Sequence, residues 1–409
     1  MPSSSNPPRS SSAWLWLLAI AAVFSQTAIN LARPLISYKV LALGGDATAV
    51  GAVSASFALL PVAFALWMGR ISDRASRLKI LLVLGVGLLA ASAAALSLAQ
   101  GLVQVAIAAA ALGMGHLAFT IAGQSAIAKL ARPDRIDAGF GWFTAAFAVG
   151  QLVGPLLGGF LLGTDTDVHP AERLEAVNQA LLLSGGIALL ALPTCFVRLT
   201  GSRGATGRAA APAGKEPVKA ILSRPGVKAN MLASLSLLAT ADILLAFLPL
   251  IGEEKGVPPV VVGALLAVRA AATIFSRLML SVLLHRWTRD QLVFASLIGS
   301  AAGLIATPFV LDIGWAAALS LILAGFFLGL GQPLTMTLVS AAVPPEARGA
   351  ALALRLLGNR VGQVLLPAAA GLAAAPLGPS GAVWTACLVM AVSAAVKAPA
   401  ARRDGTAES

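Results

Sequence analysis

Apolar segments long enough to cross a membrane alternate with short polar segments along the chain. Residues 51–68 and 80–99 contain no charged side chain, whereas residues 69–79 between them (GRISDRASRLK) contain five. A helix needs about twenty apolar residues to cross the hydrocarbon core of a bilayer. The pattern therefore predicts membrane-spanning helices joined by short charged connections.

Twelve such helices are predicted from the apolar runs and the polar residues that bound them. They span residues 14–40, 48–69, 80–100, 102–128, 137–162, 179–198, 229–251, 259–284, 291–311, 313–342, 348–375 and 380–399. A basic stretch rich in Gly, Ala and Pro follows the sixth helix and has the composition of a flexible linker. We therefore divide the chain into a disordered N-terminus (1–13), a six-helix bundle (14–199), the linker (200–228), a second six-helix bundle (229–399) and a C-terminal tail (400–409).

The two halves resemble each other at a fixed offset of 212 residues, at which GQLVGP (150–155) aligns with GQVLLP (362–367). Some families of secondary transporters are built from two copies of one helical unit in the same orientation. Their substrate site lies between the two copies. Chance matching in low-complexity sequence is the alternative. We expect an all-α polytopic membrane protein with twelve transmembrane helices in two parallel-repeat six-helix bundles.

Composition agrees with a membrane protein and excludes several other classes. Of the 409 residues, 58% are hydrophobic and 11% are charged, against about a quarter charged in soluble domains. The net charge of +12 is spread over the connections, so it predicts no nucleic-acid partner. Both cysteines, Cys195 and Cys387, fall in apolar helices, which indicates neither a disulfide framework nor a metal site.

Lysine and arginine are concentrated on one side of the predicted helices, which sets the orientation. With the N-terminus inside, the cytoplasmic connections hold most of these residues, and the other side holds little beyond Lys39, Arg173 and Lys255. Both termini and the linker are thus predicted to be cytoplasmic. A cleaved signal peptide is the alternative for the first helix, but eleven further spans favour an uncleaved helix. The alanine-rich, lysine-poor composition suggests a GC-rich bacterial genome. We therefore expect the protein in a bacterial inner (plasma) membrane.

The segment between the second and third helices carries a recognisable motif. Gly69, Asp73, Arg74 and Arg77 resemble the pattern of the major facilitator superfamily at this place, although Ser76 stands where that pattern usually has glycine. The resemblance covers essentially the whole chain, because helix number, linker position and repeat agree. It implies that this segment is a cytoplasmic gate, which latches the outward-facing state.

A second motif lies in the fifth helix. It resembles that of the twelve-helix drug/proton antiporters of the same superfamily at Gly141, Gly150, Gly154, Pro155, Gly158 and Gly159. Glycines four residues apart let a neighbouring helix approach closely, and a plain packing face is the alternative. The arginine expected in the fourth helix of antiporters is missing, and His116 stands nearby.

Polar side chains at membrane depth are costly and mark a candidate pathway. The candidates for substrate and proton are Gln26, Asn30, Arg33, His116, Gln151, Asp242, Arg269, Gln332, Asn359, Arg360 and Gln363. Buried positive charge exceeds negative, since five arginines (33, 269, 277, 355 and 360) accompany one carboxylate, Asp242. The excess favours a substrate with a carboxylate or phosphate. For Arg33, Arg277 and Arg355, extension to the membrane surface is the alternative.

Proton coupling requires a buried group that can change its charge, and only Asp242 and His116 qualify. A permanent ion pair for Asp242 and an ordinary helix contact for His116 are the alternatives, and for His116 we favour the contact. Gly214-Lys215 is followed by Glu216, so no ATP-binding P-loop is formed. We expect a transporter rather than an enzyme or a channel, with no cofactor, a small-molecule substrate and function as a monomer. Proton-driven efflux is favoured, and proton-coupled uptake of an organic anion is the alternative.

Overall fold

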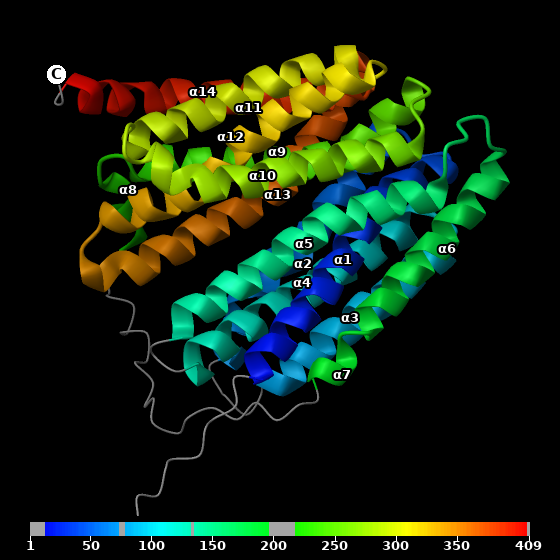
Figure 1. Ribbon diagram of the computed structural model, residues 1–409, viewed down its shortest axis with the longest axis horizontal. Coiled ribbons are helices and arrows are strands. Elements are labelled where there is room, and N and C mark those ends of the chain that lie inside the picture. Colours follow the sequence, from blue (N-terminus) through cyan, green and yellow to red (C-terminus); the bar gives the residue numbers. More distant parts are fainter. Residues whose placement is uncertain (1–12, 73–77, 132–134, 196–216, 407–409) are drawn as a thin grey trace, which may run out of the picture.

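The computed structural model describes residues 13–72, 78–131, 135–195 and 217–406, and the described chain is almost entirely helical (Figure 1). Twelve helices in these ranges are long and apolar enough to span a membrane. The prediction of an all-α polytopic membrane protein is confirmed.

Six of the long helices lie in each half of the chain, and two short helices follow the sixth. The first half contains α1 (Ala13–Ala42), α2 (Ala47–Ser72), α3 (Leu78–Leu98), α4 (Leu102–Leu130), α5 (Ile136–Leu162), α6 (Pro170–Leu189) and the short α7 (Leu192–Cys195). The second half contains the short α8 (Val218–Ser223), then α9 (Val227–Glu254), α10 (Pro259–Leu283), α11 (Arg289–Val310), α12 (Gly314–Ala341), a 3-10 turn (Pro345–Ala347), α13 (Arg348–Leu377) and α14 (Ser380–Thr406).

Helix α6 begins nine residues before its predicted start at residue 179. Its first turns are polar and so fall outside an apolar run, but they carry strong start signals. His169 caps the helix by accepting a hydrogen bond from the Ala171 amide, and Pro170 occupies the first turn. Two further segments are more helical than expected: α8 lies within the predicted linker, and α14 continues into the predicted tail.

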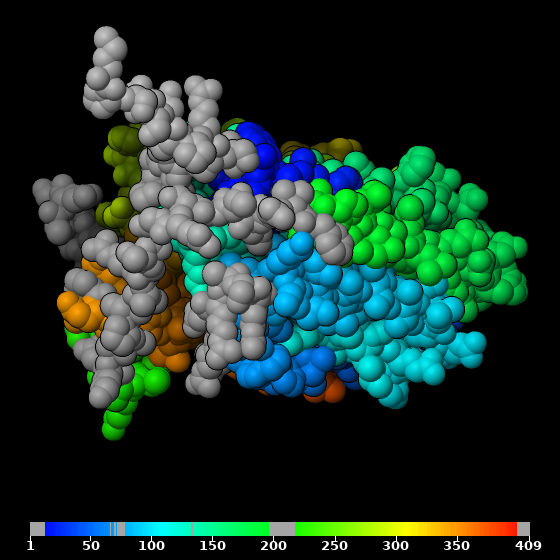
Figure 2. Space-filling view, turned by 90° about the horizontal axis from the view of Figure 1, so that it is seen from below, coloured from blue at the N-terminus to red at the C-terminus, as the bar shows by residue number. Residues whose placement is uncertain are grey.

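The helices form two bundles, α1–α6 and α9–α14, that lie side by side (Figure 1). The first bundle forms one continuous block when the molecule is seen from below (Figure 2). We call the end where α1 begins and α14 ends the termini side, and the other end the opposite side.

Among the described residues, the buried apolar core is continuous between the bundles on the opposite side only. There, Leu31 and Leu35 of α1 belong to one cluster with Phe247 of α9 and Ala374 of α13. On the termini side, buried apolar clusters stay within one bundle, one around Phe119 and another of residues between 221 and 351. The described helices are therefore joined tightly at one end and less tightly at the other.

Two glycine contacts on the opposite side bring the bundles to backbone distance. A Cβ on Gly51 of α2 would lie 2.6 Å from the Pro367 carbonyl oxygen and 2.7 Å from Gly371 Cα of α13. A Cβ on Gly263 of α10 would lie 2.4 Å from the Pro155 carbonyl oxygen and 3.0 Å from Gly159 Cα of α5. The two contacts are related by the same offset of 212 residues that relates the halves.

Polar contacts reinforce this closure. Arg173 of α6 donates to the Leu162 carbonyl at 3.3 Å, and its Nε lies 3.7 Å from a carboxylate oxygen of Glu253 on α9. The Val260 amide donates to the Gly163 carbonyl at 3.3 Å. The structure thus represents a state closed on the opposite side.

Adding one methyl group at a bundle contact tests this closure. We expect Gly263→Ala to push α10 from α5, because the Cβ would meet backbone atoms that cannot rotate away. Spin labels on residues 163–169 and 311–313 should give a longer distance distribution by double electron–electron resonance. Gly186→Ala is the control, since nothing lies within 4 Å of that Cβ. Equal distance distributions in Gly263→Ala and Gly186→Ala would contradict the conclusion that the α5–α10 contact closes the opposite side.

Candidate functional site

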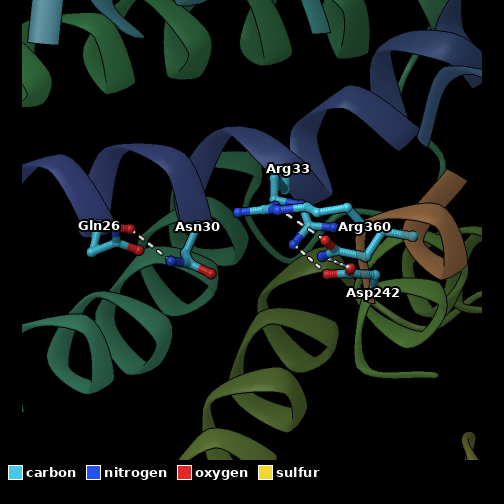
Figure 3. A network of polar contacts seen from close by, with 6 residues as sticks. Gln26, Asn30, Arg33, Asp242 and Arg360 are labelled. Atoms are coloured by element: carbon cyan, nitrogen blue, oxygen red, sulfur yellow. Dashed lines mark hydrogen bonds and ion pairs between the residues drawn. The ribbon is translucent and has the colours of Figure 1, made fainter. Parts of the chain in front are cut away.

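An ion pair between α1 and α9 joins the two bundles (Figure 3). Arg33 Nη1 of α1 donates to Asp242 Oδ1 of α9 at 2.7 Å. The side chains retain only 18% and 11% exposure, respectively. Pro34 follows the arginine within α1 and lacks an amide hydrogen, which permits a bend of the helix at this point.

The second oxygen of Asp242 continues the network into α13. Gln363 Nε2 donates to Asp242 Oδ2 at 2.6 Å, and Gln363 Oε1 accepts from Arg360 Nη1 at 3.1 Å. Two arginines from opposite bundles are thus linked to one carboxylate (Figure 3). Arg33 contacts Asp242 directly, and Arg360 is linked to it through the side-chain amide of Gln363. Arg269 of α10 and Arg360 also lie within electrostatic range of Asp242. One negative charge therefore faces three guanidinium groups.

An aromatic wall from the first bundle adjoins the ion pair. The Arg33 guanidinium carbon lies 4.8 Å from the centre of the Phe57 ring of α2, a cation–π contact. The His116 ring of α4 lies between Phe57 and Phe147, with centroid separations of 6.3 and 6.1 Å. Gln26 Nε2 is 3.3 Å from His116 Nδ1, so the amide donates and the ring nitrogen accepts. The site combines cationic, amide and aromatic surfaces.

Other predicted site residues lie beside this network or apart from it. Asn30 donates to the Gln26 carbonyl at 2.8 Å within α1 (Figure 3). Asn359 is buried on α13 and its Oδ1 has no hydrogen-bond partner, whereas Gln151 on α5 is half-buried. Gln332 belongs to a separate group, because its Nε2 donates to the Ser234 carbonyl.

That separate group holds a buried arginine without a carboxylate. Arg355 Nη2 donates to the Gln332 carbonyl at 3.0 Å, to Gln332 Oε1 at 2.8 Å and to Thr335 Oγ1 at 3.1 Å. The Nε atoms of Arg269, Arg277 and Arg355 are buried without a hydrogen-bond partner. Arg33 and Arg355 therefore do not extend to the membrane surface, because their guanidinium groups are bound inside the protein.

The glycines of α5 determine how closely α1 approaches. A Cβ on Gly150 would lie 2.3 Å from Gln26 Cβ, and one on Gly154 would lie 2.6 Å from the Asn30 carbonyl carbon. A Cβ on Gly158 would lie 3.1 Å from Leu31 Cδ1. These contacts position the part of α1 that carries the polar stripe. The remaining glycines of the motif differ, since Gly159 faces α10 and Gly141 has open space around it.

Comparison with known proteins identifies the family. Residues 15–289 and 231–408 match the family model described as Major Facilitator Superfamily. The chain belongs to the Major Facilitator Superfamily. It is therefore a membrane transporter rather than an enzyme.

Solved structures of transporters share the fold. A bacterial homolog of the human lysosomal transporter Spinster, in an inward-facing and unoccupied conformation, has a TM-score of 0.71 at 16% identity, over 97% of this chain and 96% of that one. The D-xylose-proton symporter has a TM-score of 0.73 at 16% identity, over 94% and 97%. The nucleoside transporter NupG has a TM-score of 0.69 at 16% identity, over 95% and 98%.

One curated relative matches locally. The tetracycline resistance protein, class B, of Escherichia coli is 34% identical over 116 residues. The match spans 27% of this chain and 27% of that protein.

The superfamily gate motif falls largely outside the described residues. Gly69 lies near the end of α2, and Asp73, Arg74 and Arg77 are not among the residues that the structure describes. Their role as a cytoplasmic gate remains a prediction from the resemblance.

Two lysines are buried in the structure. From the sequence they were assigned to the connections on the two sides of the membrane, Lys39 to the outside and Lys397 to the cytoplasm. Lys39 is 1% exposed, and its Nζ donates to the Ser97 carbonyl at 3.0 Å and to Asn178 Oδ1 at 2.5 Å. Lys397 is fully buried and forms an ion pair with Asp290. Their burial could not be predicted from sequence because each lies within a few residues of the predicted end of its helix (40 and 399), where lysine is ordinarily solvated.

A mutant cycle tests whether Arg33 and Asp242 stabilise the fold as a pair. We expect Arg33→Gln alone or Asp242→Asn alone to lower the free energy of unfolding by about 3–5 kcal/mol. Each change removes one member of the ion pair and leaves the charge of the other member buried. The double variant should be closer to wild type than the sum of the single changes. Thermal unfolding in detergent measures all three, and strict additivity would contradict direct pairing.

Proposed function

We propose that this protein exports a small anionic or amphiphilic organic molecule in exchange for protons, by alternating access of one central site. The proton gradient is the energy source, and no cofactor takes part. We further propose that the protein resides in a bacterial inner membrane with both termini cytoplasmic, and that it works as a monomer.

The observation that carries the proposal is the charge imbalance around Asp242. Arg33 contacts the carboxylate, Arg360 reaches it through Gln363, and Arg269 lies within electrostatic range, all in a region of low dielectric. Arginine does not release its proton in proteins, so the excess positive charge has to be balanced by an anion or by solvent. A carboxylate or phosphate fits a guanidinium in bidentate fashion, whereas a cationic guest would add to the repulsion.

The exchange follows from competition for Arg33. An entering anion takes the place of Asp242 on Arg33, and the carboxylate stays ionised beside the other guanidinium groups. Loss of the ion pair frees α1 from α9, so the bundles reorient and the anion leaves outside. Asp242 then takes up a proton from outside, which keeps the pair apart while the empty site returns. The proton is released inside when the pair forms again. His116 stays neutral in this scheme and holds Gln26 and the aromatic wall in place.

Efflux is favoured by the glycine pattern of α5, which resembles that of drug/proton antiporters, and by the partial match to a tetracycline resistance protein. The alternative is proton-coupled uptake of an organic anion, for which a proton symporter among the similar folds is the supporting observation.

Transport in membrane vesicles of both orientations tests the proposal. Everted and right-side-out vesicles are given a proton gradient and a panel of radiolabelled organic anions, with lipophilic cations as controls. We expect anions to accumulate in everted vesicles and to be lost on adding a protonophore. Accumulation in right-side-out vesicles alone would establish uptake, and transport of cations alone would refute the anion assignment.

Asp242→Asn separates binding from coupling. The asparagine keeps the shape of the carboxylate but cannot exchange a proton, so we expect anion binding to persist while gradient-driven accumulation falls to the background level. Counterflow without a gradient, measured from pH 5.5 to 8, should lose its pH dependence. Gradient-driven transport with the wild-type pH profile would exclude Asp242 as the coupling group.

A further inference from the structure

A cationic cavity lies apart from the central ion pair, at the termini side of the second bundle. Its volume is about 390 Å³, and it is formed by the connection between α10 and α11 together with Leu338 of α12. The lining includes His285, Arg286, Trp287 and Arg289. The lining begins directly after α10 ends. This end of α10 lies at the same end of the molecule as the C-terminus (Figure 1).

The positive charge of this cavity is not neutralised by its own carboxylate. Asp290 also lines the cavity, but it forms an ion pair with the buried Lys397, which in turn donates to Asn230 Oδ1 at 2.7 Å. Within the described ranges, neither Arg286 nor Arg289 has a carboxylate within ion-pair distance. Two guanidinium groups therefore remain available to an anion.

Histidine and tryptophan add the other features of a headgroup site. His285 Nδ1 donates a hydrogen bond to the Ser281 carbonyl oxygen at 2.6 Å, so Nε2 is the ring nitrogen left to contact a ligand. Trp287 is 49% exposed. An exposed indole beside arginines is typical of the membrane–water interface.

An apolar stripe leads from the membrane interior to this cavity. Phe275, Leu278 and Val282 of α10 are 56%, 72% and 55% exposed and fall on one helical face. The stripe covers about 10 Å along the helix. It ends two residues before the cavity lining begins at Leu284. In a membrane protein such a face contacts acyl chains, so one amphiphile can cover stripe and cavity together.

We propose that this cavity binds the headgroup of an anionic phospholipid, whose acyl chains lie along α10. The phosphate contacts Arg286 and Arg289, and the tryptophan lies at the level of the glycerol backbone. Inorganic phosphate shares the headgroup chemistry, but it cannot use the stripe, which favours the lipid.

Native mass spectrometry of the purified full-length protein tests the site. The protein is equilibrated with an equal mixture of phosphatidylglycerol and phosphatidylcholine. We expect wild type to retain phosphatidylglycerol selectively, and Arg286→Gln/Arg289→Gln to lose about fivefold in retention for each arginine removed. Lys219→Gln/Arg348→Gln is the control, because it removes the same charge from exposed positions on the same side, outside the cavity.

Each other outcome overturns the proposal. Equal loss in the control would indicate a general charge effect, and equal retention in the arginine variant would place the lipid elsewhere. Displacement of phosphatidylglycerol by millimolar inorganic phosphate would indicate a phosphate site. If the double variant is not recovered folded, as judged by size-exclusion chromatography, Arg286→Gln and Lys219→Gln are compared singly under the same criteria.

Discussion

The cost of unpaired guanidinium groups inside a membrane protein is the constraint on which the central site depends. Three arginines share one carboxylate, and the carboxylate is bound at both oxygens, by Arg33 and by Gln363. Any rearrangement that separates Arg33 from Asp242 has to supply another anion or neutralise the acid. Because α1 and α9 belong to different bundles, this local requirement is also a constraint on how the bundles move.

The rest of the fold holds the bundles in a defined relation around that pair. Glycine contacts related by the internal repeat bring α2 to α13 and α5 to α10 on the opposite side. A shared apolar cluster and the Arg173–Glu253 pair close the same end. On the termini side, the buried clusters of the described residues remain within single bundles. With the predicted orientation, this asymmetry corresponds to a state closed to the outside.

Much of the architecture could be predicted from sequence because membrane solvation imposes simple rules. Length and hydropathy identify the helices, and polar residues at membrane depth identify Arg33, Asp242 and Arg360. Partners could not be predicted in the same way. Arg33 and Asp242 are 209 residues apart. Arg33 is also one of the three arginines for which extension to the membrane surface is the alternative, so sequence alone does not select it as the partner of the acid. Phe57 has the appearance of any lipid-facing residue, and the polar start of α6 has no apolar signature. These features depend on tertiary packing.

The most direct test of the account is whether anion binding excludes the proton from Asp242. Protein in weakly buffered detergent solution at mildly acidic pH is mixed with an anion that it transports, and the pH change is recorded. The account predicts proton release in wild type and none in Asp242→Asn, although the variant still binds. Proton uptake by wild type together with the anion, or equal proton release by both proteins, would contradict exchange of anion and proton at the Arg33–Asp242 pair.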